Sequence, residues 1–296
     1  NNSLTAQSYY EEANLNAYPW EQCVKILNPL SSDLGVMRQT LLFGGLESIR
    51  RNINRKAANL KFFEVGNTYK YEKEKWSEEN PIKAYQQEYH LALWITGKRV
   101  QGSWAHADEE SSFYELEANV ENILRRIGIA QNALTTEASD NNIFDKALTL
   151  KTRGGKTIVE MGILSHKLLK KMDIAQTVFY ADIHWTNLMK AIRKNKLQFQ
   201  ELSKYPSVSR DLALLLDSNI EFAQIEEIAR QTEKKLLKKV ELFDVYEGKN
   251  LPEGKKSYAV NFILQDETKT LNDKAIDAIM QKLIKNITTK LGAELR

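Results

Sequence analysis

Four polar side chains that could contact a ligand together occur near the segment from Leu242 to Val260. Asp244 and Tyr246 are two residues apart, and Ser257 and Asn261 are four residues apart. Because side chains alternate between the two faces of a β-strand, each pair shares one face of its strand. An aromatic ring, a carboxylate and a hydroxyl suit a single-stranded nucleic-acid base, which stacks on the ring and forms hydrogen bonds through its edge.

The apolar residues of the same two strands predict which face stays open. Phe243 and Val245 share the other face of the first strand, and the second strand alternates with a bulky apolar set, Tyr258, Val260, Phe262 and Leu264. We expect these apolar sets to pack beneath helices, which leaves Asp244, Tyr246, Ser257 and Asn261 on an uncovered face. Lys255 and Lys256 flank Ser257 and are expected to contact backbone phosphates. An open face that carries ordinary polar residues, or that binds a protein partner, remains the alternative.

The elements that would position these residues follow one order over the last hundred residues: strand, helix, strand, strand, helix, strand. Leu212, Leu214 and Leu216 alternate as in a strand, and Ser218 with Glu221 suggests a capping box at the start of the first helix. Two helices that follow the first and third strands of a four-stranded antiparallel sheet are typical of a ferredoxin-like βαββαβ fold.

The preceding residues alternate between strand and helix patterns, and a charged stretch near residue 200 suggests a boundary between domains 1–199 and 200–296. Strands are expected at Val24–Leu27, Leu60–Val65, Tyr89–Thr96, Ile143–Thr152, Lys156–Leu164 and Val178–Ile183, and helices at Met37–Lys56, Phe113–Ile127 and Leu188–Lys194. Gly154 and Gly155 would turn the hairpin between the fourth and fifth of these strands. The fold class is therefore α+β.

Composition limits the classes of function. The 296 residues are 42% hydrophobic and 27% charged, with a net charge of only +3, and residues 200–296 hold 16 basic and 16 acidic residues. Strong non-specific binding of RNA is therefore not expected. The single Cys23 fits a reducing cytoplasm, and neither a signal peptide nor an apolar run of membrane-spanning length is visible. Because the sequence lacks an initial Met, we expect it to be a fragment of a longer chain.

Several motifs resemble the β subunit of bacterial phenylalanyl-tRNA synthetase. They are LNPLSSDLGVMRQTLL and FFEVG in the first part, and YPSVSRDLALLLD, LFDVYEG, PEGKKS and GAELR in the second. The resemblance covers nearly the whole chain and is most specific from Tyr205 to Arg296. It implies a catalytic-like domain related to the antiparallel-sheet core of class II aminoacyl-tRNA synthetases, followed by a ferredoxin-fold anticodon-binding domain.

The resemblance also implies partners and roles. The family is an α2β2 heterotetramer that attaches phenylalanine to its tRNA with ATP and Mg²⁺, and its α subunit carries the chemistry. Asp244, Tyr246 and Ser257 fall where the family contacts the first anticodon base. This chain would therefore bind no cofactor itself, and it would pack against α and recognise phenylalanine tRNA.

The sequence departs from the family pattern at two places. Phe43 stands where the family usually has Pro, and FDKALTLK (144–151) replaces a His-Pro-Gly type stretch. Both departures concern local loop geometry. The family's N-terminal tRNA-binding, editing and magnesium-binding motifs do not occur in this sequence.

The sequence predicts no active site. A class II site needs one Arg on a strand for the α-phosphate and another after a Gly-rich strand for the γ-phosphate. Arg38, Arg50 and Arg51 fall in a helix-like stretch. The four histidines, His90, His106, His166 and His184, are scattered without metal-ligand spacing, so no metal site is expected. The fragment alone is therefore predicted to be catalytically inactive.

Overall fold

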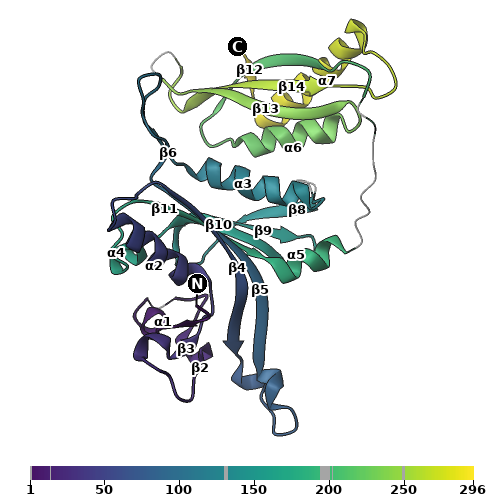
Figure 1. Cartoon of the computed structure of the whole chain (residues 1–296). Helices are drawn as coiled ribbons and strands as arrows, with labels where there is room; N and C mark the ends of the chain where they lie inside the picture. Colours follow the sequence, from purple (N-terminus) through teal and green to yellow (C-terminus); the bar gives the residue numbers. More distant parts are fainter. Residues whose placement is uncertain (1, 14, 130–132, 194–200, 202, 249–250) are drawn as a thin grey trace. The chain divides into compact units, whose positions relative to one another are not determined.

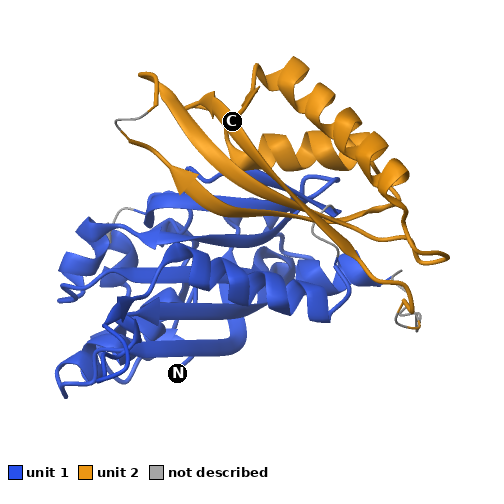
Figure 2. Cartoon of the chain, turned by 90° about the horizontal axis from the view of Figure 1, so that it is seen from above, with its two compact units in different colours: residues 1–197 blue, residues 198–296 orange. Residues whose placement is uncertain are grey.

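The computed structural model describes residues 2–13, 15–129, 133–193, 201, 203–248 and 251–296 (Figure 1). The chain divides into two compact units, residues 1–197 and 198–296 (Figure 2). The domain boundary expected near residue 200 falls on residues outside the described ranges.

Unit 1 is built on a six-stranded sheet in which every neighbouring pair of strands is antiparallel. In spatial order the strands are β4 (Leu60–Tyr71), β5 (Tyr85–Thr96), β11 (Val178–His184), β10 (Thr157–Leu164), β9 (Phe144–Thr152) and β8 (Leu134–Ala138). Gly155, at φ 76°, supplies the left-handed backbone conformation in the turn between β9 and β10, as predicted. β4 and β5 each continue beyond the predicted range, and β8 was not expected from the sequence.

Smaller elements surround this sheet. The helices are α1 (Ser8–Ala13), α2 (Leu42–Ile53), α3 (Phe113–Arg126), α4 (His166–Lys171) and α5 (Trp185–Ile192). Short strands form two further sheets: β1 (Leu4–Thr5), β3 (Val36–Met37) and β2 (Val24–Lys25) in one, and β6 (Lys98–Val100) with β7 (Glu109–Glu110) in the other.

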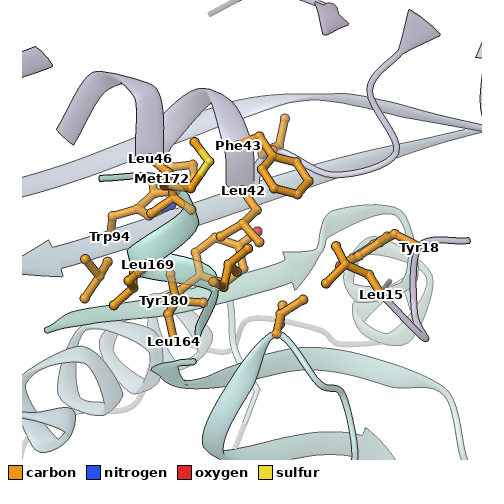
Figure 3. Close-up of a cluster of buried hydrophobic side chains, with 14 of the residues drawn as sticks. Leu15, Tyr18, Leu42, Phe43, Leu46, Trp94, Leu164, Leu169, Met172 and Tyr180 are labelled. Atoms are coloured by element: carbon orange, nitrogen blue, oxygen red, sulfur yellow. The ribbon is translucent and has the colours of Figure 1, made fainter. Parts of the chain in front are cut away.

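Both faces of the six-stranded sheet are covered. Alternation along β5 sends Ala92 and Trp94 to one face and Leu91 and Ile95 to the other. The first face packs against α2, α4 and the N-terminal segment, and its core includes Leu15, Tyr18, Leu42, Phe43, Leu46, Trp94, Leu164, Leu169, Met172 and Tyr180 (Figure 3). The second face packs against α3 and α5. Phe43, one of the departures from the family pattern, is 2% exposed and stacks with Tyr9 at 4.8 Å between ring centroids.

Unit 2 has the predicted βαββαβ order. Its elements are β12 (Val208–Asp217), α6 (Phe222–Thr232), β13 (Leu237–Tyr246), β14 (Lys255–Leu264), α7 (Asp273–Leu291) and β15 (Glu294–Leu295). The four strands pair in the order β13-β14-β12-β15, and all pairs are antiparallel. Both helices lie on one face of the sheet (Figure 2). They share a core with this face that includes Ile225, Leu283 and Ile287. The ferredoxin-like fold is therefore confirmed.

Two local expectations in unit 2 are wrong. The N-cap of α6 is Glu221, which forms a capping box with Gln224, so Ser218 has no part in it. Phe243 and Val245 do not pack beneath the helices and are 59% and 49% exposed. A register shift between Leu242 and Asp244 places Phe243 in a β-bulge, and the end of the strand from Phe243 to Tyr246 is exposed.

Among the described helices, none combines the length and the apolar character needed to cross a membrane.

Candidate nucleic-acid interface

The face of the unit 2 sheet opposite its helices, called here the open face, carries the polar residues singled out in the sequence. The backbone register pairs Tyr246 with Ser257, Asp244 with Ala259, and Glu241 with Asn261. Directly opposed residues of an antiparallel pair point to the same face. The intervening residues of β14, including Tyr258, Val260 and Phe262, are buried against the helices. The alternation therefore placed Asp244, Tyr246, Ser257 and Asn261 correctly, although the bulge at Phe243 was missed.

Two alanines face each other in the middle of the open face, beside a leucine and a serine. Ala213 of β12 lies directly opposite Ala259 of β14, and Leu215 lies opposite Ser257. Asp244 is exposed and Tyr246 is 38% exposed at the edge of this floor, whereas Ser257 is buried with its hydroxyl directed to the same face. An aromatic ring and a carboxylate beside a floor of alanines leave room for a flat ligand.

Arg296 reaches Tyr246 from the opposite edge of the sheet, a contact that was not predicted from the sequence. Its backbone N–H donates to the carbonyl of Ala213 at 3.0 Å, which extends the pairing of β15. Its guanidinium carbon is 5.7 Å from the centroid of the Tyr246 ring, within cation–π range. The signal was present in the sequence, because Ala293 packs into the core and a period of two then assigns Glu294 and Arg296 to the open face.

Gly248 allows the Tyr246 ring to take this position. A Cβ atom on Gly248 would lie 2.7 Å from the Tyr246 hydroxyl oxygen and 2.8 Å from Cζ. Side-chain carbons do not approach other atoms so closely, so any other residue at 248 would displace the ring. Gly248 of the LFDVYEG motif therefore leaves the space that the Tyr246 ring occupies.

Asn261 is already hydrogen-bonded within the sheet. Its side-chain amide group, Nδ2, donates to Oγ of Ser209 and to Oδ1 of Asp211, the second at 2.5 Å. Both amide hydrogens are therefore used, and the oxygen Oδ1 is what Asn261 can offer to a ligand.

The two lysines beside Ser257 lie on opposite faces. Lys255 shares the open face and forms an ion pair with Asp217 at 2.9 Å. Lys256 is only 7% exposed, on the helix side, and its Nζ lies 4.6 Å from the centroid of the Tyr258 ring. The expectation that Lys256 flanks the open face is wrong, because strand alternation turns its side chain away.

The arginine that a synthetase active site would require serves a structural role in unit 1. Arg38 follows β3 and precedes α2, so its expected place on a helix is wrong. Its buried guanidinium donates to the carbonyls of Asn2 and Asn67 and forms a 2.6 Å ion pair with Glu64. Gly66 provides the space, since a Cβ atom there would lie 2.2 Å from a guanidinium nitrogen. These contacts leave Arg38 badly placed to hold a phosphate.

Two of the four histidines come together in unit 1. Strand pairing sets His184 of β11 directly opposite His90 of β5, and their ring centroids are 4.5 Å apart. Asp182 and Glu88 lie beside them, whereas His106 and His166 are exposed elsewhere. The expectation of scattered histidines is therefore wrong for this pair, because the register between two distant strands cannot be read from spacing along the chain.

Comparison with known proteins bears on both units. Residues 1–185 match the family model described as the phenylalanyl tRNA synthetase beta chain CLM domain, and residues 203–296 match the ferredoxin-fold anticodon binding domain. The phenylalanine–tRNA ligase beta subunits of Bacteroides fragilis, Bacteroides thetaiotaomicron and Porphyromonas gingivalis are 57%, 58% and 50% identical over all 296 residues. The chain spans about a third of these relatives, 36% of each.

Solved structures give weaker matches. A pyrrolysyl-tRNA synthetase from Desulfitobacterium hafniense matches with a TM-score of 0.46 at 12% identity, covering 67% of each chain. A second structure of that organism's pyrrolysyl tRNA synthetase has a TM-score of 0.44 at 15% identity, covering 69% of this chain and 66% of the other.

Proposed function

The chain belongs to the phenylalanyl-tRNA synthetase β-chain family, and we propose that its open face recognises the anticodon of phenylalanine tRNA within phenylalanine–tRNA ligase. The single observation that carries the proposal is the convergence of Tyr246, Asp244 and Ser257 on one uncovered sheet face. The family model for residues 203–296, an anticodon-binding domain, supports the same role. A protein partner on this face is not favoured.

Each side chain has a distinct task in this proposal. The Tyr246 ring stacks on the first anticodon base, and the Arg296 guanidinium covers the opposite side of the ring. The Asp244 carboxylate accepts hydrogen bonds from N–H groups of the base edge, and the Ser257 hydroxyl donates or accepts beside it. The Asn261 oxygen Oδ1 is a further acceptor on the same face.

Phosphate contacts are expected to be few. Lys255 is the lysine of the GKKS segment that shares the open face, and Asp217 already partly neutralises it. Residues 200–296 are balanced, with 16 basic and 16 acidic residues. Base contacts should therefore dominate in this unit, while other parts of the enzyme supply most of the affinity for the tRNA backbone.

Fluorescence anisotropy at low salt with a labelled anticodon stem-loop of phenylalanine tRNA tests the proposal. The 296-residue chain should bind this stem-loop more tightly than one whose first anticodon base is changed. Hydrogen bonds to a charged group contribute about 1.5–3 kcal/mol, which is a factor of about 10 to 150 in affinity. D244N should remove most of this preference, while D277N, an exposed position on α7, should retain it. Equal binding of both stem-loops by the unmodified chain would refute the proposal.

Unit 1 is proposed to be non-catalytic. ATP needs fixed cations at its phosphates, but the guanidinium of Arg38 is buried and held by Asn2, Glu64 and Asn67. Arg38 is therefore not free to hold a phosphate, and we assign ATP and Mg²⁺ to the α subunit of the enzyme. ATP–pyrophosphate exchange by the 296-residue chain should be absent, and any measurable exchange would overturn this assignment.

The partner subunit is proposed to contact the edge strand β4. Phe63 and Val65 of this strand are exposed, and Phe63 borders an apolar groove of about 440 Å³ between β4, β5 and α3. Exposed apolar residues on an edge strand are unfavourable in an isolated protein and suit a subunit interface. Co-purification with the α subunit in an α2β2 assembly should be lost in F63D and retained in F243D, an exposed phenylalanine of unit 2. We also propose a cytoplasmic location for the assembled enzyme.

A further inference from the structure

Unit 1 contains a second cluster with ligand chemistry, unrelated to the open face. Glu88 and His90 are two residues apart on β5 and therefore share a face, and His184 of β11 lies directly opposite His90. Each of these three residues offers one nitrogen or oxygen atom, and these atoms lie within 4.8 Å of one another. We call Glu88, His90 and His184, with Asp182 beside them, the histidine cluster.

Asp182 fixes the orientation of His90. Nδ1 of His90 hydrogen-bonds to Oδ1 of Asp182 at 2.7 Å, and both side chains are about 5% exposed. This contact assigns Nδ1 as the protonated donor and directs Nε2 toward Glu88. A carboxylate that holds the distal nitrogen of a histidine in this way is the usual outer-shell arrangement of metal-binding histidines.

The Nε2 atom of His90 is buried without a hydrogen bond. Within the described part of the chain it has no hydrogen-bond partner, and Oε2 of Glu88 is 3.6 Å away. A buried polar atom left unsatisfied costs about 1–3 kcal/mol. A buried nitrogen that has no hydrogen bond and is aimed at a carboxylate and a second imidazole therefore points to a ligand that completes the group.

The other two members are accessible. The side chains of Glu88 and His184 are 49% and 25% exposed, so an ion can reach the cluster from solvent. The carboxylates of Asp182 and Glu88 lie beside the two rings and favour a positive ion at this position.

We propose that Glu88, His90 and His184 bind a divalent transition-metal ion of the Zn²⁺ class, with Asp182 as the outer-shell partner of His90. Oε2 of Glu88 is 3.6 Å from Nε2 of His90 and 4.0 Å from Nδ1 of His184. Ligand atoms around a tetrahedral Zn²⁺ with bonds of about 2.1 Å are about 3.4 Å apart, so small side-chain rotations complete the site. Two imidazoles and one carboxylate favour Zn²⁺ over Mg²⁺, which prefers oxygen ligands and retains water.

Three protein ligands leave one position of a tetrahedral ion for water. The ion would join β5 to the end of β11, directly before α5, and would thereby fasten two strands at the centre of the sheet. Because binding to the folded state alone raises apparent stability, Zn²⁺ should increase the Tm of the chain.

The test is a Zn²⁺ titration of the metal-stripped 296-residue chain by isothermal calorimetry, followed by visible absorption of the Co²⁺-loaded chain. We expect one equivalent of Zn²⁺ per chain, a rise in Tm, and the absorption bands of nitrogen- and oxygen-bound Co²⁺. H184A and E88Q alter the more exposed ligands and should each weaken Zn²⁺ binding at least about tenfold. D182N should weaken it by about 10- to 100-fold through His90.

Matched controls separate the cluster from adventitious binding. H166A and H106A each remove an exposed histidine outside the cluster and should leave stoichiometry and affinity unchanged. Circular dichroism of each variant verifies folding, and H184A and E88Q keep the test valid if D182N does not fold. The proposal is overturned if the unmodified chain binds no more Zn²⁺ than the folded E88Q/H184A double variant, or if Mg²⁺ raises Tm as effectively as Zn²⁺.

Discussion

The guanidinium of Arg296 lies 5.7 Å from the ring centroid of Tyr246, although the two residues come from opposite edges of the unit 2 sheet. Tyr246 ends β13, Arg296 follows β15, and strands β14 and β12 lie between them. The short side chains of Ala213 and Ala259 in these middle strands allow the two long side chains to meet. The ring proposed to stack on the anticodon base is thus held from across the sheet.

R296A should weaken tRNA binding less than loss of the tyrosine ring does. A cation–π contact at an exposed site contributes about 0.5–1 kcal/mol, which is a factor of about 2 to 5 in affinity. Stem-loop binding by anisotropy gives the comparison. R210A is the matched control, because the exposed side chain of Arg210 alternates to the helix face and lies near Asp273. An equal effect of both variants would mean that only net charge matters.

G248A should impair RNA binding without unfolding the chain. The added Cβ atom would lie 2.7 Å from the Tyr246 hydroxyl oxygen, so the ring must move from its place beside Arg296. We expect affinity for the stem-loop to fall by nearly as much as in Y246A, with the urea midpoint little changed. In G154A the added Cβ atom would make only an ordinary 3.8 Å contact with Thr152, so this variant should bind normally. Normal binding by G248A would exclude a fixed ring position.

D182A should destabilise unit 1 strongly. Removing one partner of a buried ion pair leaves the other charge uncompensated and costs about 3–5 kcal/mol of unfolding free energy. Both Asp182 and His90 are about 5% exposed. E109A breaks the exposed pair with Arg99 and should cost no more than about 1 kcal/mol. Urea unfolding in the presence of a chelator provides the measurement, and comparable losses in the two variants would contradict the assigned burial.

Cys23 should report the unfolding of unit 1 through its reactivity. Burial raises the pKa of the Cys23 thiol, partly offset by the hydrogen bond from Gln39, whose Nε2 is 3.1 Å from Sγ. The raised pKa means that less thiolate is present at any given pH, so the rise of labelling rate with pH should shift to higher pH in the folded chain. At pH 8.5 we expect labelling at least about tenfold slower than in urea. Equal rates would show that the thiol is accessible.

The sequence predicted the fold best where the pattern was long and regular. The helical stripe from Phe113, the hairpin around Gly155 and the βαββαβ order all appear in the structure. β8 was missed because the segment from Leu134 to Ala138 has apolar residues only at its two ends and depends on pairing with β9. The cap of α6 was misplaced because the N-cap is Glu221, three residues after Ser218, and Glu is not among the residues usually favoured at this position.

The candidate site was predictable where it depended on alternation within one strand. Asp244, Tyr246, Ser257 and Asn261 followed from the period of two, and Lys256 should have been excluded by the same rule. Contacts that depend on tertiary register could not be predicted. The approach of Arg296 to Tyr246 needs the strand order of the complete sheet. The histidine cluster needs the pairing of β5 with β11, which are about 90 residues apart in the chain.

Coupling between the Tyr246 ring and the first anticodon base tests the central claim most directly. The measurement is the affinity of the assembled enzyme for phenylalanine tRNA and for the same tRNA lacking that base. Both affinities are measured for the unmodified enzyme and for the Y246A enzyme. With the tyrosine present, loss of the base should cost about 1–3 kcal/mol of binding free energy, a factor of about 5 to 150. With Y246A the same loss should cost almost nothing more. An equal cost in both enzymes would show that Tyr246 does not contact the base.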